Sequence, residues 1–246
     1  MKNKSTGIII AAAILIFGGF FTWAIIHKQS ETVDTSKYDT NTVISASEEN
    51  GNIAEHVEGN PDAEILFVEY SDYQCSGCAS VVSSVRQLLE KYGDKIGVIH
   101  RTYVLSYHSN GVAAASAVEA AGLQGYWKKY GDYLFEKQAD WFYSDANQRT
   151  EQFITYFKEV TDGKGDVEKF VSDMGGEQVK AKVNFDISLA KKVSNQIDYT
   201  PAFFIDGKFI DWSNELAELN KDKGENEKKL TFVDYFSDLI EKRLDK

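Results

Sequence analysis

The strongest hydrophobic pattern in the chain lies between residues 63 and 105. The apolar run Ile65–Tyr70, interrupted by a single acid, predicts a buried strand. Apolar residues then recur at helical spacing as far as Gly93, a typical helix stop. These residues are Val81, Val85, Leu88, Leu89 and Tyr92. A second apolar run, Ile96–Leu105, predicts another strand, so the whole segment predicts two parallel strands joined by a right-handed helical crossover.

The middle of the chain, from Tyr107 to about Gln196, has the periodicity of helices. An alanine-rich stretch of high helix propensity comes first, and aromatic residues at helical spacing follow. These aromatic residues include Trp127, Tyr130, Trp141, Phe153, Tyr156 and Phe157. Such stripes either line a groove or form a core, and we interpret them as core because that is the commoner role.

Strand signals return after the helical region. Residues 201–211 contain two short apolar runs around Asp206-Gly207, which is typical of a two-residue hairpin turn. The charged residues 213–229 predict a solvated surface insertion. Residues 231–244 predict a final amphipathic helix, with a capping box that starts at Thr231.

This order of elements predicts the domain organisation. The hairpin can complete the sheet that the first two strands begin. We therefore predict a single α/β domain over residues 53–246, in which a helical insertion occupies residues 107–184, approximately.

The amino terminus has a different pattern. Residues 7–26 carry no charge and, at ~1.5 Å per residue, are long enough to cross the ~30 Å hydrocarbon layer. This length, without a small-residue cleavage site after it, favours a retained transmembrane anchor over a cleaved signal peptide. Lys2 and Lys4 favour a cytoplasmic amino terminus. We predict a cytoplasmic end and anchor over residues 1–28, and a flexible polar tether over residues 29–52 that leads to a domain outside the cytoplasm.

Composition excludes some classes of function. Apolar residues make up 43% of the chain and aromatic residues 13%, which is enough for a folded core. The formal net charge is −11, and no dense basic cluster occurs outside the first few residues. We therefore expect no nucleic-acid partner, because phosphate binding needs concentrated positive charge.

The candidate chemistry lies in the only two cysteines, Cys75 and Cys78, which stand at the predicted start of the first helix. None of the four histidines lies at a zinc-finger spacing, so a zinc site is disfavoured. A purely structural disulfide would close a very short loop and constrain the unfolded chain little. Redox chemistry is the favoured use, because backbone N–H groups at a helix start stabilise a thiolate.

The positions of the two cysteines predict different roles. Cys75, nearer the end of the strand, is the exposed sulfur that attacks or is attacked. Cys78, one turn into the helix, attacks the resulting mixed disulfide and releases the partner.

Three features of the chain resemble the DsbA-like branch of the thioredoxin superfamily: GNPDAEILFVEYSDYQCSGC, the later DYTPAFFIDGKFI, and the helical insertion between them. The resemblance extends from about Ile53 to Leu244. It implies a thioredoxin-like fold and a cis peptide bond between Thr200 and Pro201, facing the active-site sulfurs. It also implies that Glu69 is a buried acid that assists proton transfer, although a solvent-facing residue on an edge strand is the alternative.

Some nearby residues receive no role in this interpretation. Asp72 and Gln74 are predicted to be loop residues without chemistry, and His108 a surface residue at a helix start. The residues between the cysteines, Ser76 and Gly77, depart from the strongly oxidising members of the family, which usually carry proline after the first cysteine. The direction of thiol exchange is therefore open at this point.

The leading hypothesis is a single-pass cell-membrane protein that acts outside the cytoplasm as a dithiol oxidase. It would pass its Cys75–Cys78 disulfide to exported proteins that carry thiols, and a membrane redox partner would reoxidise it. No flavin or nucleotide motif is evident, so we expect no bound cofactor, and we expect a monomer. The alternatives are a disulfide reductase or isomerase of the same fold, and a non-catalytic, membrane-tethered binding module with a structural disulfide.

Overall fold

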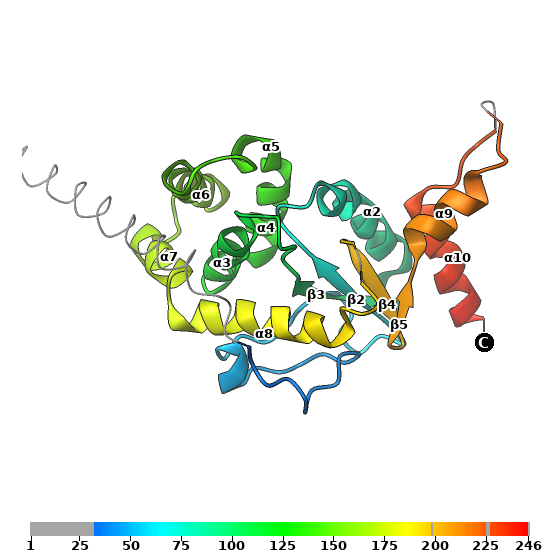
Figure 1. Ribbon diagram of the computed structural model, residues 1–246, viewed down its shortest axis with the longest axis horizontal. Coiled ribbons are helices and arrows are strands. Elements are labelled where there is room, and N and C mark those ends of the chain that lie inside the picture. The colour runs from blue at the N-terminus through cyan, green and yellow to red at the C-terminus, as the bar shows by residue number, and fades with distance from the viewer. Residues whose placement is uncertain (1–31, 198, 225–226, 246) are drawn as a thin grey trace, which may run out of the picture.

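The computed structural model describes residues 32–197, 199–224 and 227–245 (Figure 1). The predicted transmembrane segment at residues 7–26 lies outside these residues. Within them, no helix combines the length and the apolar character that a membrane span requires.

The fold is built around a five-stranded mixed sheet with the order β1-β3-β2-β4-β5. The strands are β1 (His56–Gly59), β2 (Ile65–Ser71), β3 (Ile96–Thr102), β4 (Ala202–Ile205) and β5 (Lys208–Ile210). Strands β2 and β3 are parallel, and the other neighbours are antiparallel. The predicted crossover unit and hairpin are confirmed, whereas β1 was not predicted. Its four residues show no clear alternation of buried and exposed positions.

Each face of the sheet has its own helical cover (Figure 1). Helices α2 (Ser76–Tyr92) and α10 (Phe232–Leu244) pack on the face that carries Phe67, Val98 and Phe203. Helix α8 (Glu177–Val193) contributes Ala190 and Val193 to the other face. The 3-10 helix η2 (Gly93–Lys95) follows α2, and the capping box at Thr231 is present at the start of α10.

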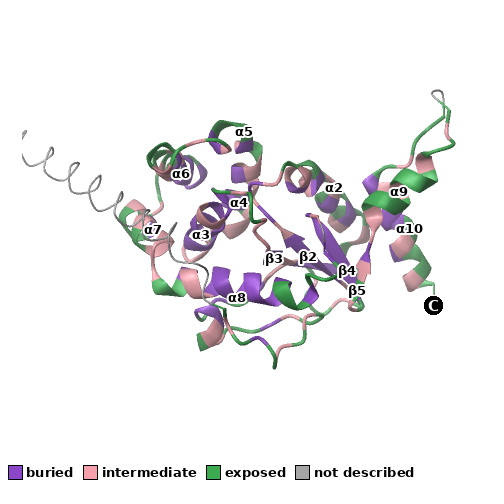
Figure 2. Cartoon of the chain, in the orientation of Figure 1, coloured by how far each residue is buried: buried purple, intermediate pink, exposed green. Residues whose placement is uncertain are grey.

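The insertion forms a second core beside the sheet. Its helices are α3 (Gly111–Gly122), α4 (Trp127–Glu136), α5 (Gln138–Trp141), α6 (Ala146–Val160), α7 (Val167–Met174) and α8. The predicted core role of the aromatic stripes is confirmed at four fully buried residues: Tyr130, Trp141, Phe153 and Phe157. Figure 2 shows that buried residues lie along the middle of α8, the helix that packs on both the insertion and the sheet.

The charged segment at 213–229 contains a helix that the sequence pattern did not predict. Helix α9 (Trp212–Asn220) has no buried residue, consistent with a surface location (Figure 2). Its half-buried Trp212 and Leu216 pack against the apolar cluster of α10. Two apolar side chains one turn apart therefore hold this helix in place.

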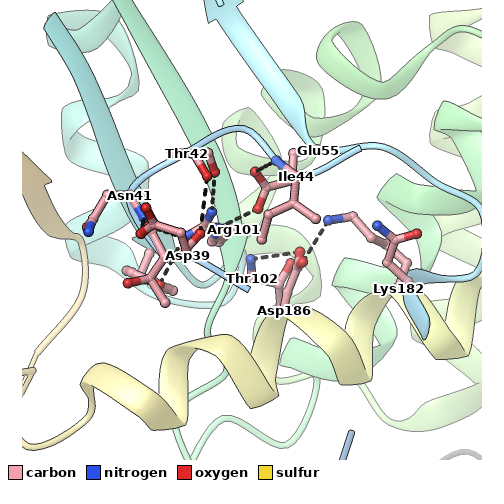
Figure 3. A network of polar contacts seen from close by, with 12 residues as sticks. Asp39, Asn41, Thr42, Ile44, Glu55, Arg101, Thr102, Lys182 and Asp186 are labelled. Atoms are coloured by element: carbon pink, nitrogen blue, oxygen red, sulfur yellow. Dashed lines mark hydrogen bonds and ion pairs between the residues drawn. The ribbon is translucent and has the colours of Figure 1, made fainter. Parts of the chain in front are cut away.

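The predicted flexible tether over residues 29–52 is wrong for residues 32–52, which pack against the domain. Ile44 is 5% exposed, and residues Glu48–Asn50 form the 3-10 helix η1. Buried Arg101 of β3 donates to the carbonyl groups of Thr40 and Thr42 and to the Glu55 carboxylate (Figure 3). Ile44, Val33 and Tyr38 also pack against Phe185 and Leu189 of α8. The segment looks like a linker in sequence because these apolar residues have no regular period and because a buried charge from β3 satisfies its carbonyl groups.

Candidate active site

The two cysteines lie at the start of α2, four to seven residues after the carboxyl end of β2. Cys75 is the N-cap residue, with extended backbone angles (φ −80°, ψ 121°), and is half-buried. Cys78 lies in the first helical turn and is 1% exposed. Both are free thiols in the structure. Cys75 is therefore the more accessible of the two sulfurs, and the burial of Cys78 was not predicted.

The two sulfurs have opposite acidities. A hydrogen bond from the Cys78 thiol is the largest cause that lowers the pKa of Cys75, which falls to about 5 although burial opposes the change. The nearby Thr200 side chain and the backbone N–H groups of Cys78 and Gly77 lower the pKa of Cys75 further. Burial is the largest cause that raises the pKa of Cys78, and the neighbouring Cys75 raises it further. Cys75 is thus the ready nucleophile, and Cys78 keeps its proton.

Thr200 and Pro201 face Cys75 from the start of β4, and the bond between them is cis, as the resemblance implies. The Cys75 thiol donates to the carbonyl oxygen of Thr200 at 3.4 Å. The Thr200 hydroxyl is buried and has no hydrogen-bond partner among the described residues, so it is free to donate to a thiolate.

Gly77 allows α2 to approach this loop closely. A Cβ atom at position 77 would lie 3.1 Å from the Thr200 carbonyl oxygen and 3.6 Å from Pro201 Cδ. A larger residue at position 77 would therefore crowd the Thr200–Pro201 loop. The sequence alone did not reveal this reason for the glycine.

Glu69 lies in the middle of β2, the central strand of the sheet, and is 5% exposed. The alternative of a solvent-facing edge residue is wrong. Its carboxylate contacts His100 Nδ1 of β3 at 3.0 Å. Among the described residues, no hydrogen bond joins Glu69 to either cysteine. Glu69 therefore does not contact the sulfurs through a direct hydrogen bond.

Asp72 and Gln74, to which the sequence assigned no role, shape the loop before Cys75. Asp72 accepts hydrogen bonds from the backbone N–H groups of Gln74 and Leu105 and contacts His108 Nδ1 at 2.7 Å. The His108 side chain is 9% exposed, so its prediction as a surface residue is wrong. The only sequence signal for this cluster is the aspartate itself, a residue that often caps the backbone two positions on.

The helical insertion holds the same loop from the other side. The Gln74 side chain donates to the carbonyl oxygen of Phe142, and Gln138 of α5 donates to those of Tyr73 and Cys75. These bonds connect the insertion directly to the backbone of the nucleophile.

A group of aromatic rings, two of them exposed, lies next to these contacts. We define the aromatic rim as Tyr107, His108, Phe142 and Tyr143, whose rings contact one another in that order at centroid distances of 4.6, 6.1 and 4.6 Å. Tyr107 is 75% exposed and Tyr143 is 92% exposed. The rim adjoins the loop that leads to Cys75, because His108 contacts Asp72 and the Phe142 carbonyl group accepts a hydrogen bond from Gln74. Among the described residues, no group of three or more histidine, cysteine, aspartate or glutamate side chains is arranged to hold a metal ion.

Comparisons with known proteins agree with this fold. A family model described as Thioredoxin matches residues 51–221. The chain is 26% identical to the "Probable disulfide bond formation protein D" of Bacillus cereus over 218 residues, which cover 84% of this chain and 89% of that protein. The crystal structure of oxidised BdbD from Bacillus subtilis superposes with a TM-score of 0.58 at 20% identity, covering 85% of this chain and 100% of that one.

A second group of relatives is much longer than this chain. The chain is 28% identical to the Na(+)/H(+) antiporter NhaA of Herminiimonas arsenicoxydans over 207 residues, which are 84% of this chain and 30% of the antiporter. The chain thus spans less than a third of that protein's length.

Proposed function

The chain belongs to the thioredoxin family, with a DsbA-like helical insertion and the two-thiol site of a thiol–disulfide oxidoreductase, and on this premise we propose that it is a dithiol oxidase. In this role it passes the Cys75–Cys78 disulfide to protein substrates that carry free thiols. The name of the Bacillus cereus relative, "Probable disulfide bond formation protein D", supports this proposal.

One observation carries the direction of exchange: the lowered pKa of Cys75, to about 5, beside a Cys78 whose pKa is raised. A stabilised thiolate favours the reduced form of the pair. A protein whose reduced form is stabilised gives up its disulfide readily and is a strong oxidant.

The reaction takes two exchanges. A substrate thiolate attacks Cys75 Sγ, the Cys75–Cys78 bond breaks, and Cys78 leaves and takes up a proton. A second substrate thiolate then attacks the substrate sulfur of the mixed disulfide, and Cys75 leaves as its stabilised thiolate. The substrate gains one disulfide, and the Cys75–Cys78 pair gains two electrons.

We further propose that the protein is anchored in the cell membrane by residues 7–26, with the domain outside the cytoplasm. The uncharged run in the sequence supports the anchor. A membrane redox partner would reoxidise the Cys75–Cys78 pair to the disulfide. We also propose a monomer, because one chain contains all the residues of the site. Fractionation of cells should find the full chain with membranes, and protease added outside the cytoplasmic membrane should remove the domain. Recovery of the intact chain in the soluble fraction would refute the anchor.

The reduction potential tests the oxidase proposal against its nearest alternative. We expect the full chain, equilibrated with glutathione, to have a potential well above the value of about −270 mV known for thioredoxin and closer to about −120 mV, the value for DsbA. A potential at or below that of thioredoxin would make the protein a reductase. A disulfide that glutathione cannot reduce in the folded protein would favour the structural staple of a binding module.

A further inference from the structure

The loop that faces the nucleophile is held from behind by the start of helix α9. The indole N–H of Trp212, the first residue of α9, donates to the carbonyl oxygen of Pro201 at 3.1 Å. The hydroxyl group of Tyr199 donates to the carboxylate of Asp211 at 3.2 Å. The residues on either side of Thr200 are therefore both tied to the same short segment at the start of α9.

The register of the sheet explains why these segments meet. Strands β4 and β5 are antiparallel, and Phe203 lies opposite Ile210. Continuing this register by two residues places Pro201 opposite Trp212. The chain leaves the sheet at that point, because α9 begins there, and the Pro201 carbonyl group accepts its hydrogen bond from the side chain of Trp212.

The direction of the indole N–H is fixed by packing. The half-buried ring of Trp212 meets the ring of Phe232 of α10 edge-on, at a centroid distance of 5.0 Å. Phe232 is 8% exposed and contacts Phe203 of β4 at 5.6 Å. A ring packed in this way keeps few rotamers, so its N–H points steadily at the loop.

Thr200, between the two ties, is the residue that contacts the nucleophile. The Cys75 thiol donates to the Thr200 carbonyl oxygen at 3.4 Å. After the Cys78 thiol, which is the largest cause, the Thr200 side chain also lowers the pKa of Cys75. The Thr200 hydroxyl is buried and has no hydrogen-bond partner among the described residues, so its position depends on the backbone of the loop.

We propose that Trp212 is a positioning residue for thiol exchange at Cys75: its indole N–H holds the Pro201 carbonyl group and thereby keeps the Thr200 hydroxyl within reach of the thiolate. The inference rests on the proposed function and adds to it a residue outside the two cysteines and the loop that faces them. It also connects the charged surface segment that contains α9 to the reacting sulfur, through the first residue of that helix.

The acidity of Cys75 in the reduced full chain tests this role, and the absorbance of the thiolate during a pH titration measures it. Trp212→Phe keeps an aromatic ring against Phe232, removes the N–H, and removes no titratable group. We expect it to raise the pKa of Cys75 by about 0.5 to 1 pH unit, and by no more than Thr200→Val does. Such a shift is a fall of about threefold to tenfold in the acid dissociation constant of the thiol.

A double variant distinguishes positioning from a direct effect on the sulfur. If Trp212 acts through the Thr200 hydroxyl, its N–H has nothing to position once that hydroxyl is gone. Trp212→Phe combined with Thr200→Val should therefore have the Cys75 pKa of Thr200→Val alone, within about 0.3 pH unit.

Two controls separate the hydrogen bond from a general loosening of the fold. Leu216→Ala shortens the other side chain that packs α9 against α10 and keeps the indole N–H. Trp141→Phe removes an indole N–H that donates to the Leu134 carbonyl oxygen at 2.9 Å, inside the insertion. Both should leave the Cys75 pKa unchanged. If Trp212→Phe does not accumulate as folded protein, Trp212→Leu, which also lacks the donor, is used with the same expectations.

The outcomes are distinct. An unchanged pKa in Trp212→Phe, an equal rise in either control, or a double variant whose shift is the sum of the two single shifts overturns the inference and leaves the proposed function standing. A wild-type Cys75 that titrates near the ordinary value of 9.0 refutes the proposed function, and this inference with it.

Discussion

The sulfurs of Cys75 and Cys78 behave differently because they lie one helical turn apart, in different surroundings. Cys75 sits at the N-cap of α2, where N–H groups and the Cys78 thiol point at it, and its pKa falls to about 5. Cys78 is enclosed, and its pKa rises. The division of labour between attacking and resolving sulfur is a consequence of position.

The Thr200 hydroxyl offers a test of this electrostatic balance. Its loss in Thr200→Val should raise the pKa of Cys75 by about one pH unit, since a hydrogen bond to a charged group is worth about 1.5 kcal/mol. Thr200→Ser keeps the hydroxyl and should leave the pKa unchanged. Absorbance of the thiolate at 240 nm during a pH titration measures both. Equal pKa values in Thr200→Val and the wild type would show that the hydroxyl does not reach the thiolate.

The lowered pKa also predicts how stability depends on pH. Unfolding restores Cys75 to an ordinary pKa of 9.0, so the unfolded reduced chain binds more protons than the folded one between pH 5 and 9. The folded reduced protein should therefore gain stability, relative to the disulfide form, as pH rises through this window. It should lose that contribution as pH falls through about 5. Denaturant unfolding of both forms at pH 4.5 and pH 7.5 measures the difference, and a constant difference would contradict the shift.

At the scale of elements, the sequence pattern predicts β2, β3 and the β4–β5 hairpin from their apolar runs, and α2 and α10 from apolar faces of helical period. The cysteines could be placed at a helix start for the same reason. The sequence pattern does not predict strand β1, helix α9 or the packing of residues 32–52. Their contacts depend on partners far away in sequence, such as Arg101 for Thr40 and Thr42. The pattern also does not predict that Asp72 pairs with His108 or that Glu69 pairs with His100.

Arg101 connects the amino-terminal segment to the sheet, and its removal should be costly. The side chains of Arg101 and Glu55, which face each other in Figure 3, are both 0% exposed. Arg101→Met leaves Glu55 buried without its cation, which should lower the free energy of unfolding by about 3–5 kcal/mol. Lys242→Met breaks the exposed Lys242–Asp238 pair of α10 and should cost less than about 0.5 kcal/mol. Urea denaturation compares the two, and similar losses would show that residues 40–55 add little to stability.

At the scale of the whole molecule, the sheet supplies the two sulfurs and the Thr200–Pro201 loop, and the insertion supplies what surrounds them. Gln138 of α5 and the carbonyl of Phe142 hold the loop that ends in Cys75. Through Phe142, the aromatic rim is connected to the loop that carries the nucleophile.

The rim should matter for protein substrates and not for small thiols. Tyr143→Ser should reduce kcat/KM for oxidation of a reduced, unfolded protein roughly threefold to tenfold, the range expected from losing one aromatic contact. Reaction with dithiothreitol should not change. Leu219→Ser on α9, where Leu219 is 53% exposed, is the matched control and should affect neither reaction. An equal loss with both thiol substrates would place Tyr143 in the support of the site and not in substrate contact.

The acidity of Cys75 in the reduced full chain is the measurement on which the proposed chemistry depends most directly. Alkylation of both thiols across pH 3–10, followed by mass spectrometry, reports each sulfur separately. We expect Cys75 to become reactive with an apparent pKa of about 5 while Cys78 stays unmodified to alkaline pH. A Cys75 that titrates near the ordinary value of 9.0, or two cysteines of equal reactivity, would contradict it.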